Sequence, residues 1–283
     1  MRGAGGEPIR SLARTAVVAV VRPGIDRDWL TRVAAQDPFT HAFAVWDLAR
    51  YPDRTSFLSC TEGSETTGYL LVWHGDPARP VVHWVGDADR SRPLGDHLPP
   101  PPFIAVVPEG AAATLLHSSG DAVGAPILGE VAARATPVPP ATFPGVRRLR
   151  VEDRRKLAAW AELQIDPIVR GYSTLDPARD IAWAAFEAGE PVGVAYRLAE
   201  GPGLWLLGAI YVDPAHRRRG VGYALTATAV GDARHAGADA GLWVREENVT
   251  ARHVYERLGF RRVQRKWWVE VGPGARRASP QHL

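Results

Sequence analysis

The stretch Leu204–Leu225, LWLLGAIYVDPAHRRRGVGYAL, constrains the fold more than any other part of the sequence. Leu204–Val212 has no charged residue and is rich in Leu, Ile, Val and aromatic side chains, which predicts a strand covered on both faces. Pro214 ends this strand, apolar residues recur at helical spacing from Val221 onward, and Gly237 provides the stop signal. The pattern predicts a buried strand, a basic loop and a helix.

The loop between the strand and the helix has the composition of an anion-binding site. The start of a helix leaves backbone N–H groups without partners and carries the positive end of the helix dipole. Gly220 and Gly222 let a phosphate approach the main chain and permit positive φ angles. The arginines Arg217, Arg218 and Arg219 add planar donor groups that suit phosphate oxygens. We therefore predict a pyrophosphate-binding loop.

Three known phosphate loops are candidates for this segment. A Walker loop needs Gly-Lys-Ser or Gly-Lys-Thr, and the segment has no lysine. A dinucleotide fingerprint needs a third glycine or an alanine where Leu225 stands. The third pattern, Arg/Gln-x-x-Gly-x-Gly/Ala after a strand that ends in Val-x-Pro, is complete in Val212-Asp213-Pro214 and Arg217–Gly222. This segment resembles the acetyl-CoA loop of the GNAT superfamily of N-acetyltransferases.

A second segment supports the same resemblance. Gly241–Arg245 predicts a short strand, Asn248 is placed to open a helix, and the apolar residues of Val249–Leu258 fall on one helical face. The pattern that begins at Asn248, contains Tyr255-Glu256 and ends at Gly259-Phe260 is similar to the last motif of that superfamily. The two motifs in this order indicate an acetyl-CoA site.

The resemblance assigns roles to individual residues. It implies that the backbone at the end of the central strand contacts the pantetheine arm, and that Tyr255 protonates the departing thiolate. The residues it places at acetyl-CoA are Ile210, Tyr211, Val212, Arg217, Arg218, Arg219, Gly220, Val221, Gly222, Tyr223 and Asn248. Ordinary structural roles stay open for several of them: a core position for Tyr255, and a helix N-cap for Asn248.

The general base is not defined by the motifs. Many relatives carry a Glu on the central strand, but Leu204–Val212 has no acid. The remaining candidates are Glu246 and Glu247 after the next strand, and Asp166 and Asp176 further upstream, all of which also fit solvated surface acids. We expect His216 and His253, in or beside the two motifs, to be exposed.

Composition excludes several other classes of protein. The net charge is only +3 with an isoelectric point near 9.2, and no nucleic-acid-binding motif is present, so we expect no nucleic-acid partner. The single cysteine, Cys60, excludes a disulfide framework and a Cys-rich metal site, and we expect no metal. No apolar run approaches about 18 residues, so we expect a cytoplasmic protein without a membrane segment, either a monomer or a homodimer.

The chain divides at Ala135–Gly145, a segment with four prolines. We predict an N-terminal domain over 1–134, a linker over 135–145, a second domain over 146–271 and a flexible tail over 272–283. Both domains show the same series of strand, Gly-Glu turn, strand, Gly-Pro turn and strand, which indicates a diverged duplication. The first domain has Gly86–Ser91 where the phosphate loop would stand, so we expect it not to bind CoA in this way.

Shorter patterns place the other elements. The predicted strands are Thr15–Val21, Ser56–Cys60, Gly68–Trp73, Val81–Val85, Phe103–Val107, Ile181–Phe186 and Val192–Leu198, and the predicted helices are Asp26–Ala35, Pro38–Tyr51 and Val151–Ala161. Together with the motifs, they predict an α/β protein with a mixed sheet and a tandem GNAT-like fold.

The predicted activity is transfer of an acetyl group from acetyl-CoA to a primary amine, by direct attack of the amine on the thioester. The acceptor is a small molecule or a peptide. Two alternatives remain open: a CoA-binding sensor or scaffold without catalysis, and a tandem enzyme acting on the amine of a thiol sugar, similar to mycothiol synthase.

Overall fold

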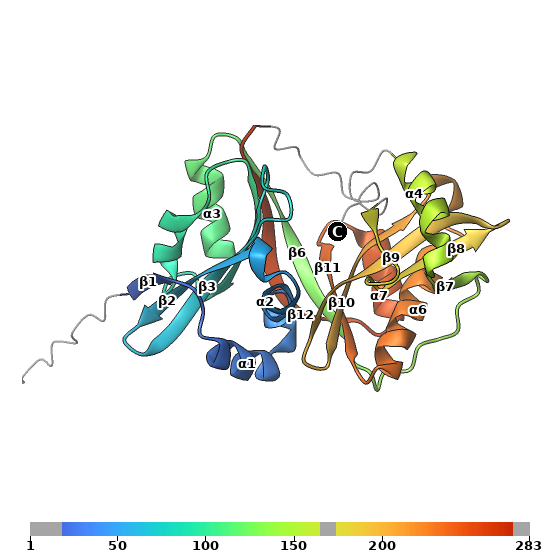
Figure 1. The fold of residues 1–283 in the computed structure, drawn as a ribbon, viewed down its shortest axis with the longest axis horizontal. Coiled ribbons are helices and arrows are strands. Elements are labelled where there is room, and N and C mark those ends of the chain that lie inside the picture. The colour runs from blue at the N-terminus through green and yellow to red at the C-terminus, as the bar shows by residue number, and fades with distance from the viewer. Residues whose placement is uncertain (1–18, 165–173, 274–283) are drawn as a thin grey trace, which may run out of the picture.

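The computed structural model describes residues 19–164 and 174–273, and within these ranges twelve strands form one mixed sheet (Figure 1). Their order across the sheet is β1-β2-β3-β4-β5-β12-β6-β11-β10-β9-β8-β7. The strands are β1 Ala19–Pro23, β2 Thr55–Glu62, β3 Glu65–Trp73, β4 Val81–Gly86, β5 Phe103–Val107, β6 Ala122–Ala132, β7 Val146–Arg148, β8 Ala182–Glu187, β9 Glu190–Gly201, β10 Leu204–Val212, β11 Asp239–Arg245 and β12 Arg261–Val271.

Helices cover both faces of the sheet. The α-helices are α1 Arg27–Gln36, α2 Pro38–Arg50, α3 Glu109–Ser118, α4 Arg154–Glu162, α6 Val221–His235 and α7 Val249–Arg257. Side chains of α6 and α7 pack with the strands of the C-terminal half on one face, where α3 also packs on β12. Helices α1, α2 and α4 pack on the opposite face. The fold is therefore α/β, as the sequence predicts.

The helix starts follow from local chemistry. Asp37 precedes Pro38, and its carboxylate accepts a hydrogen bond of 3.0 Å from the N–H of Thr40, which caps α2. Asp26 caps α1 in the same way, through the N–H groups of Asp28 and Trp29. These caps place α2 across the face of the sheet that α6 and α7 leave uncovered.

The two halves repeat one series of strands. In the N-terminal half, β2, β3 and β4 are antiparallel and β4 runs parallel to β5. In the C-terminal half, β8, β9 and β10 are antiparallel and β10 runs parallel to β11. This is the duplication that the matching turn patterns predict.

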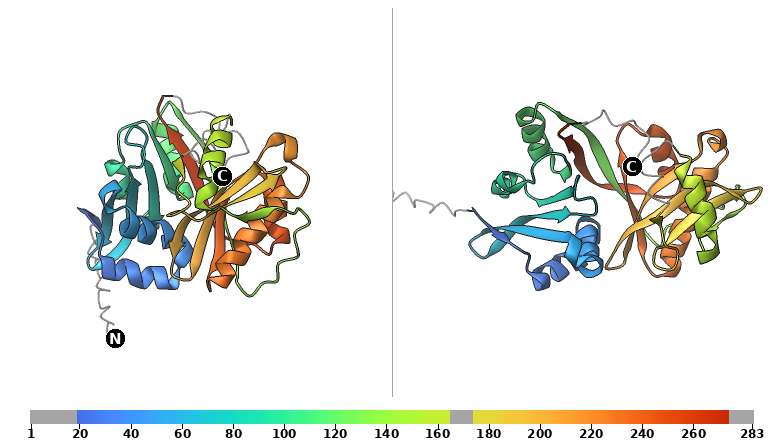
Figure 2. Two further views of the ribbon diagram at one scale, coloured as in Figure 1. Left: turned by 45° about the vertical axis from the view of Figure 1, so that its right-hand side comes forward. Right: turned by 45° about the horizontal axis from the view of Figure 1, so that its top comes forward.

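The last strand of each half is exchanged with the other half. β12, at the end of the chain, pairs with β5, whereas β6 pairs with β11, and β6 and β12 pair with each other. β6 and β12 lie between the two lobes in both views of Figure 2. Each half of the sheet is therefore completed by a strand that the other half supplies.

The sequence patterns miss four of these elements: α3, β7, and the two long strands β6 and β12. β6 contains Pro126 and two glycines, and β12 begins with a charged run, RRVQRK, so neither shows the usual signal of a strand. Pairing with strands of the other half holds β6 and β12 in the sheet. A local sequence pattern does not encode such pairing. The first predicted strand, Thr15–Val21, lies partly outside the described residues. Asp166 and most of the predicted tail also lie outside them.

Candidate functional site

The parallel strands β10 and β11 separate partway along their length. Their pairing runs from Leu204 with Asp239 to Leu207 with Leu242, and Gly208–Val212 has no partner on β11. On its other side, β10 has an irregularity in its pairing with β9 between Gly208 and Tyr211, and Ala209 adopts a φ of 48°. A non-glycine residue in this region is strained, and such strain is common at functional sites. Beyond Leu207 and Leu242 the two strands no longer pair, and we call this unpaired part at their carboxyl ends the opening.

The structure places Ile210, Tyr211 and Val212 in this separated part of β10. Their backbone groups therefore have no strand beside them on the β11 side. The side chains of Ile210 and Val212 pack against the core below α6, and Tyr211 packs on the opposite face near Trp160. The hydroxyl of Tyr211 donates to Oε1 of Gln164 at 3.2 Å, a contact that sequence patterns do not reveal.

The basic loop forms a tight turn that leads directly into α6. Asp213 accepts a hydrogen bond of 2.9 Å from the N–H of Ala215, which starts the turn. Arg218 and Gly220 have φ angles of 60° and 83°, and Gly220 is the residue before the helix. No side chain caps α6, so the first N–H groups of a 15-residue helix face outward without a side-chain partner. This is the geometry of an anion site.

The glycines of the loop are open. A Cβ added at Gly222 would meet only Val212, at 3.6 Å, and one added at Gly220 would meet only the hydroxyl of Thr142, at 3.4 Å. Val221 is buried and packs in the core under the helix. The space above the two glycines is therefore available to a ligand that approaches the main chain.

The three arginines of the loop differ in their surroundings. Nε of Arg217 donates to the carbonyl oxygen of Val212 at 3.0 Å, and the guanidinium lies over the ring of Tyr211. Arg219 forms a bidentate ion pair with Glu187, the last residue of β8. Arg218 is exposed and makes no hydrogen bond or ion pair within the described ranges.

Glu187, at the end of β8, contacts two residues of the loop. Besides Arg219, it contacts Nε2 of His216 at 3.2 Å, and Nδ1 of His216 lies 3.6 Å from Asp213. The hydrogen bond from Arg219 lowers the pKa of Glu187 below its usual range, so the carboxylate stays charged. The side chain of His216 is 24 % exposed, so the expectation of an exposed residue is wrong here, whereas His253 is exposed as expected.

The linker contacts the same region. Tyr223 is buried, its hydroxyl donates to the carbonyl oxygen of Pro139 at 2.9 Å, and Arg257 lies over its ring. Val138 and Phe143 pack against the core of the C-terminal half. The proline-rich segment is thus a packed strap beside the loop, and the Tyr223 side chain serves this contact.

Tyr255 and Asn248 both belong to α7. Tyr255 is 4 % exposed, packs against Phe260, and its hydroxyl makes no hydrogen bond with any described residue. Burial raises the pKa of Tyr255 well above its usual range, and the charge of Glu130 adds to the effect, so the phenol stays protonated. Asn248 caps α7 by accepting a hydrogen bond of 3.2 Å from the N–H of Ala251. The N-cap role is thus observed for Asn248.

The candidate bases lie in different surroundings. Glu246 pairs with Arg265 at 3.0 Å, and Glu247 is exposed beyond the end of β11. Asp176 accepts a hydrogen bond from the N–H of Ala178 in a turn, beside a polar cavity of about 720 Å³ between the two halves. Asp166 lies outside the described residues. The structure brings none of the described three into hydrogen-bond contact with Tyr255.

Sequence patterns also miss two buried charges near the opening. Glu130, on the exchanged strand β6, is 5 % exposed, and its Oε2 has no hydrogen-bond partner among the described residues. Arg245, the last residue of β11, is 2 % exposed. The signal for Arg245 was present, since it ends the predicted strand Gly241–Arg245, but its burial depends on packing between the halves.

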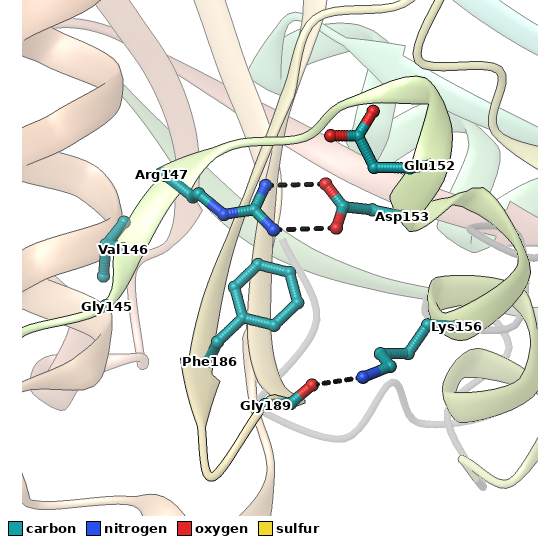
Figure 3. Close-up of a pocket in the computed structure, with 8 residues that line it drawn as sticks. All are labelled: Gly145, Val146, Arg147, Glu152, Asp153, Lys156, Phe186 and Gly189. Carbon is teal, nitrogen blue, oxygen red and sulfur yellow. Dashed lines mark hydrogen bonds and ion pairs between the residues drawn. The ribbon is translucent and has the colours of Figure 1, made fainter.

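A second cavity, of about 490 Å³, lies at the outer edge of the C-terminal half (Figure 3). Arg147 and Asp153 form a bidentate pair at 2.6 and 2.7 Å on one side, and the guanidinium lies over the ring of Phe186. Lys156 donates to the carbonyl oxygen of Gly189 at 2.7 Å. Arg147 is thus paired with Asp153, and Lys156 is bonded to the main chain. We therefore interpret the cavity as a structural contact between α4 and the sheet.

None of the helices in residues 19–164 and 174–273 combines the length and the apolar character that a membrane crossing requires. The same ranges contain no cluster of three or more His, Cys, Asp or Glu side chains arranged to bind a metal ion.

Comparison with known proteins agrees with this geometry. Residues 144–260 match the acetyltransferase (GNAT) family model. A mycothiol acetyltransferase from Thermobispora bispora is 32 % identical over 261 residues, covering 78 % of this chain and 83 % of that protein. The alignment extends beyond the family-model region, so the similarity includes the N-terminal half.

Solved structures show the same fold. A GCN5-related N-acetyltransferase from Sphaerobacter thermophilus has a TM-score of 0.60 at 17 % identity, over 89 % of this chain and 95 % of that one. A tandem GNAT protein from the clavulanic acid biosynthesis pathway has a TM-score of 0.54 at 17 % identity, over 91 % and 100 % of the two chains. The uncapped helix start after the basic loop, the family match and the relative that shares both halves agree: this chain is an acetyltransferase that belongs to the GNAT family and has a tandem GNAT fold.

Proposed function

We propose that the protein transfers the acetyl group of acetyl-CoA to a primary amine, at the opening between β10 and β11. The observation that carries this proposal is the separation of the two strands directly beside the uncapped start of α6. The helix start and its two open glycines suit the pyrophosphate of CoA. The backbone of Ile210–Val212, which β11 does not pair with, suits the amide groups of the pantetheine arm, which would bring the thioester into the opening.

Within this site the residues have distinct tasks. Gly220, Val221, Gly222 and Tyr223 present main-chain N–H groups to the phosphates, and Arg217, Arg218 and Arg219 supply positive charge around them. Backbone N–H groups of the separated strand stabilise the oxyanion that forms when the amine attacks the thioester carbon. The C–S bond then breaks, the phenol of Tyr255 gives its proton to the thiolate, and the proton that the amine nitrogen loses restores the phenol. Asn248 holds the start of α7 so that Tyr255 is fixed in place.

The N-terminal half would bind no CoA of its own. Its strand β4 is followed by the short 3-10 helix Arg92–His97, so no long helix starts there to bind a phosphate. At the end of β4, the ammonium of Lys266 donates to the carbonyl oxygen of Trp84 at 3.2 Å. We therefore expect one acetyl-CoA site per chain.

Titration calorimetry of acetyl-CoA tests the cofactor site. The wild type should bind one molecule per chain, and Gly222→Glu should abolish binding because its carboxylate would occupy and repel the phosphate site. Gly231→Glu is the matched control, since it adds the same charge to the same helix at a position with open space around it. Loss of binding in both variants, or in neither, would contradict the assignment of the loop.

The relative from Thermobispora bispora favours one acceptor class as a second candidate. Because it is named a mycothiol acetyltransferase and shares both halves with this chain, the amine of a thiol sugar is an acceptor to test directly. Steady-state acetylation of a cysteinyl glucosaminide, beside free amino acids and polyamines, would separate this acceptor from other primary amines. Turnover at the background rate with every amine, by a protein that binds acetyl-CoA, would overturn the proposed activity.

A further inference from the structure

Arg245 is a buried cation without a partner. Its side chain is 2 % exposed, and its Nε has no hydrogen-bond partner among the described residues. Its guanidinium takes part in no hydrogen bond, ion pair or ring contact with the described parts of the chain. Arginine has five N–H donors and keeps its charge in proteins, so an unpaired guanidinium in the interior is strongly unfavourable. Its presence calls for a partner that residues 19–164 and 174–273 do not supply.

The strand geometry fixes where Arg245 faces. On β11, a Cβ added at Gly241 would meet Phe39 of α2, and Trp243 packs on the same ring at 5.0 Å. Side chains alternate along a strand, so Arg245 lies on this α2 face as well. The loop before α6 serves the opposite face, where Leu242 and Val244 pack in the core with α6. Arg245 is thus on the side from which a second substrate would meet the cofactor.

Arg245 also lies across the opening from the reacting centre. The last pair between the parallel strands is Leu207 with Leu242. Three residues further, β10 has reached Ile210 and β11 has reached Arg245. The side chain is therefore at the level of the backbone to which the acetyl thioester is assigned.

A second buried cation lies in the same row. Arg245 of β11 and Lys266 of β12 both pair with Ile127 of β6, one from each side. Neighbouring strands are about 4.8 Å apart, which places the two Cα atoms roughly 10 Å from each other on one face. Lys266 is 6 % exposed and donates to Trp84. Two buried cations therefore lie on this face of the central sheet.

The nearby carboxylates do not compensate Arg245. Burial lowers the pKa of its guanidinium, and Glu247 and Glu270 offset this only in part. Glu270 is held by Arg79, and Glu247 is exposed. A single uncompensated positive charge remains, in a planar group whose geometry matches a carboxylate.

We propose that Arg245 binds a carboxylate of the acceptor, so that the preferred acceptors carry a carboxylate beside the amine. This proposal rests on the proposed acetyl transfer and names its acceptor class. The guanidinium holds the carboxylate on the α2 face, and the amine of the same molecule then faces the opening between β10 and β11. A neutral acceptor leaves the buried charge unpaired and binds more weakly.

Paired acceptors test the proposal. Glycine, β-alanine and L-cysteine would each be compared with the corresponding primary amide, which has the same amine but no carboxylate. In the wild type, kcat/KM should be about 10- to 100-fold higher for the acids, the ratio expected for hydrogen bonds between charged groups. In Arg245→Gln, KM for the acids should rise, and the ratio of kcat/KM between each acid and its amide should fall to about 1.

Two controls separate binding from folding. Arg234→Gln, at the far end of α6, removes an arginine whose Nε also lacks a partner among described residues, and should leave the acid preference unchanged. The melting temperature of Arg245→Gln should equal or exceed that of the wild type, because the variant removes an unpaired buried charge. A large fall in this temperature would show a structural role and overturn the proposal.

The outcomes are distinguishable from failure of the acetyl-transfer proposal. Acetyl-CoA binding by calorimetry, unchanged in Arg245→Gln, reports on the cofactor site alone. If the protein binds acetyl-CoA but uses the amides or a neutral cysteinyl glucosaminide as well as the acids, the carboxylate proposal is wrong and acetyl transfer stands. If none of the acids is acetylated or raises the melting temperature of the acetyl-CoA complex, the carboxylate proposal is equally overturned.

Discussion

The ammonium of Lys266 donates a hydrogen bond of 3.2 Å to the main-chain carbonyl oxygen of Trp84, and both residues are buried. Lys266 belongs to β12, at the end of the chain, and Trp84 belongs to β4 of the N-terminal half. The pairing of β4 with β5 stops at His83, so the bond satisfies a carbonyl group where these two strands separate. In the C-terminal half, the matching separation of β10 and β11 is the proposed acetyl-CoA site.

The buried Lys266 makes stability depend on pH. Burial lowers its pKa from 10.5 to about 8 in the folded protein. Between these values the unfolded chain binds more protons than the folded one, so the free energy of unfolding rises with pH, by roughly 3 kcal/mol from this residue. Urea denaturation from pH 7.5 to 10.5 should therefore show the wild type gaining stability relative to Lys266→Met.

Exposed Lys156 provides the control for this experiment. Lys156→Met also removes a lysine, but one whose side chain is 47 % exposed, so the gain in stability with pH that separates the wild type from Lys266→Met should not appear in this comparison. A constant difference between the wild type and Lys266→Met would mean that the ammonium is not held in an unfavourable environment.

Removal of the Tyr255 hydroxyl should lower the rate of the chemical step and leave acetyl-CoA binding unchanged. Tyr255→Phe should lower kcat by about 100-fold or more, since the thiolate then leaves without its proton donor. Acetyl-CoA affinity should not change. Tyr69→Phe is the matched control: it loses a 2.9 Å contact with His41 in the N-terminal half, and should lower stability by about 1 kcal/mol while kcat stays the same. Equal kcat for Tyr255→Phe and the wild type would remove Tyr255 from the mechanism.

The exchanged strands should keep a cleaved chain together. A protease site inserted between Pro140 and Ala141, in the exposed linker, would separate the halves covalently after folding. Because β6 remains paired with β11 and β12 with β5, the cut protein should elute from size-exclusion chromatography as one species, at the same volume as the uncut protein. Elution of two smaller species would contradict the exchange.

Two glycines should respond in opposite directions to alanine. A Cβ at Gly129 would lie 2.4 Å from the ring of Phe39, so Gly129→Ala should cost about 1–3 kcal/mol of unfolding free energy. Gly231 lies within α6 with open space around it, and Gly231→Ala should add up to about 1 kcal/mol. Urea denaturation of both variants measures this. A stability loss in Gly231→Ala would show that its open surroundings are not as described.

Local patterns predict the elements that have a self-contained signal. Asp37 before Pro38 marks the start of α2, Leu204–Val212 is β10 with the same bounds, and the helix after Gly220 begins as predicted. For these segments, turn chemistry and the period of apolar residues are sufficient, because each depends on neighbours in sequence. The position of the basic loop between its strand and its helix is predicted for the same reason.

What the patterns miss depends on contacts between distant segments. β12 is rich in charge, yet Lys266 is buried because β5 and β6 flank it and α2 covers the same face. Glu130 and Arg245 are ordinary charged residues in sequence, and only the pairing of β6 with β11 makes them interior. The separation of β10 from β11 is likewise a property of two strands together.

The exchange of β6 and β12 sets a rule for building hybrids of this chain with its relatives. A hybrid whose junction lies in the linker would pair each half of the sheet with a closing strand from the other parent protein. Both β6 and β12 would then meet strands that they do not meet in either parent. Cuts placed before β6 and before β12 would instead transplant each closing strand together with the sheet it completes. The unit of recombination in this molecule is therefore discontinuous in the gene, although the two halves follow one another along the chain.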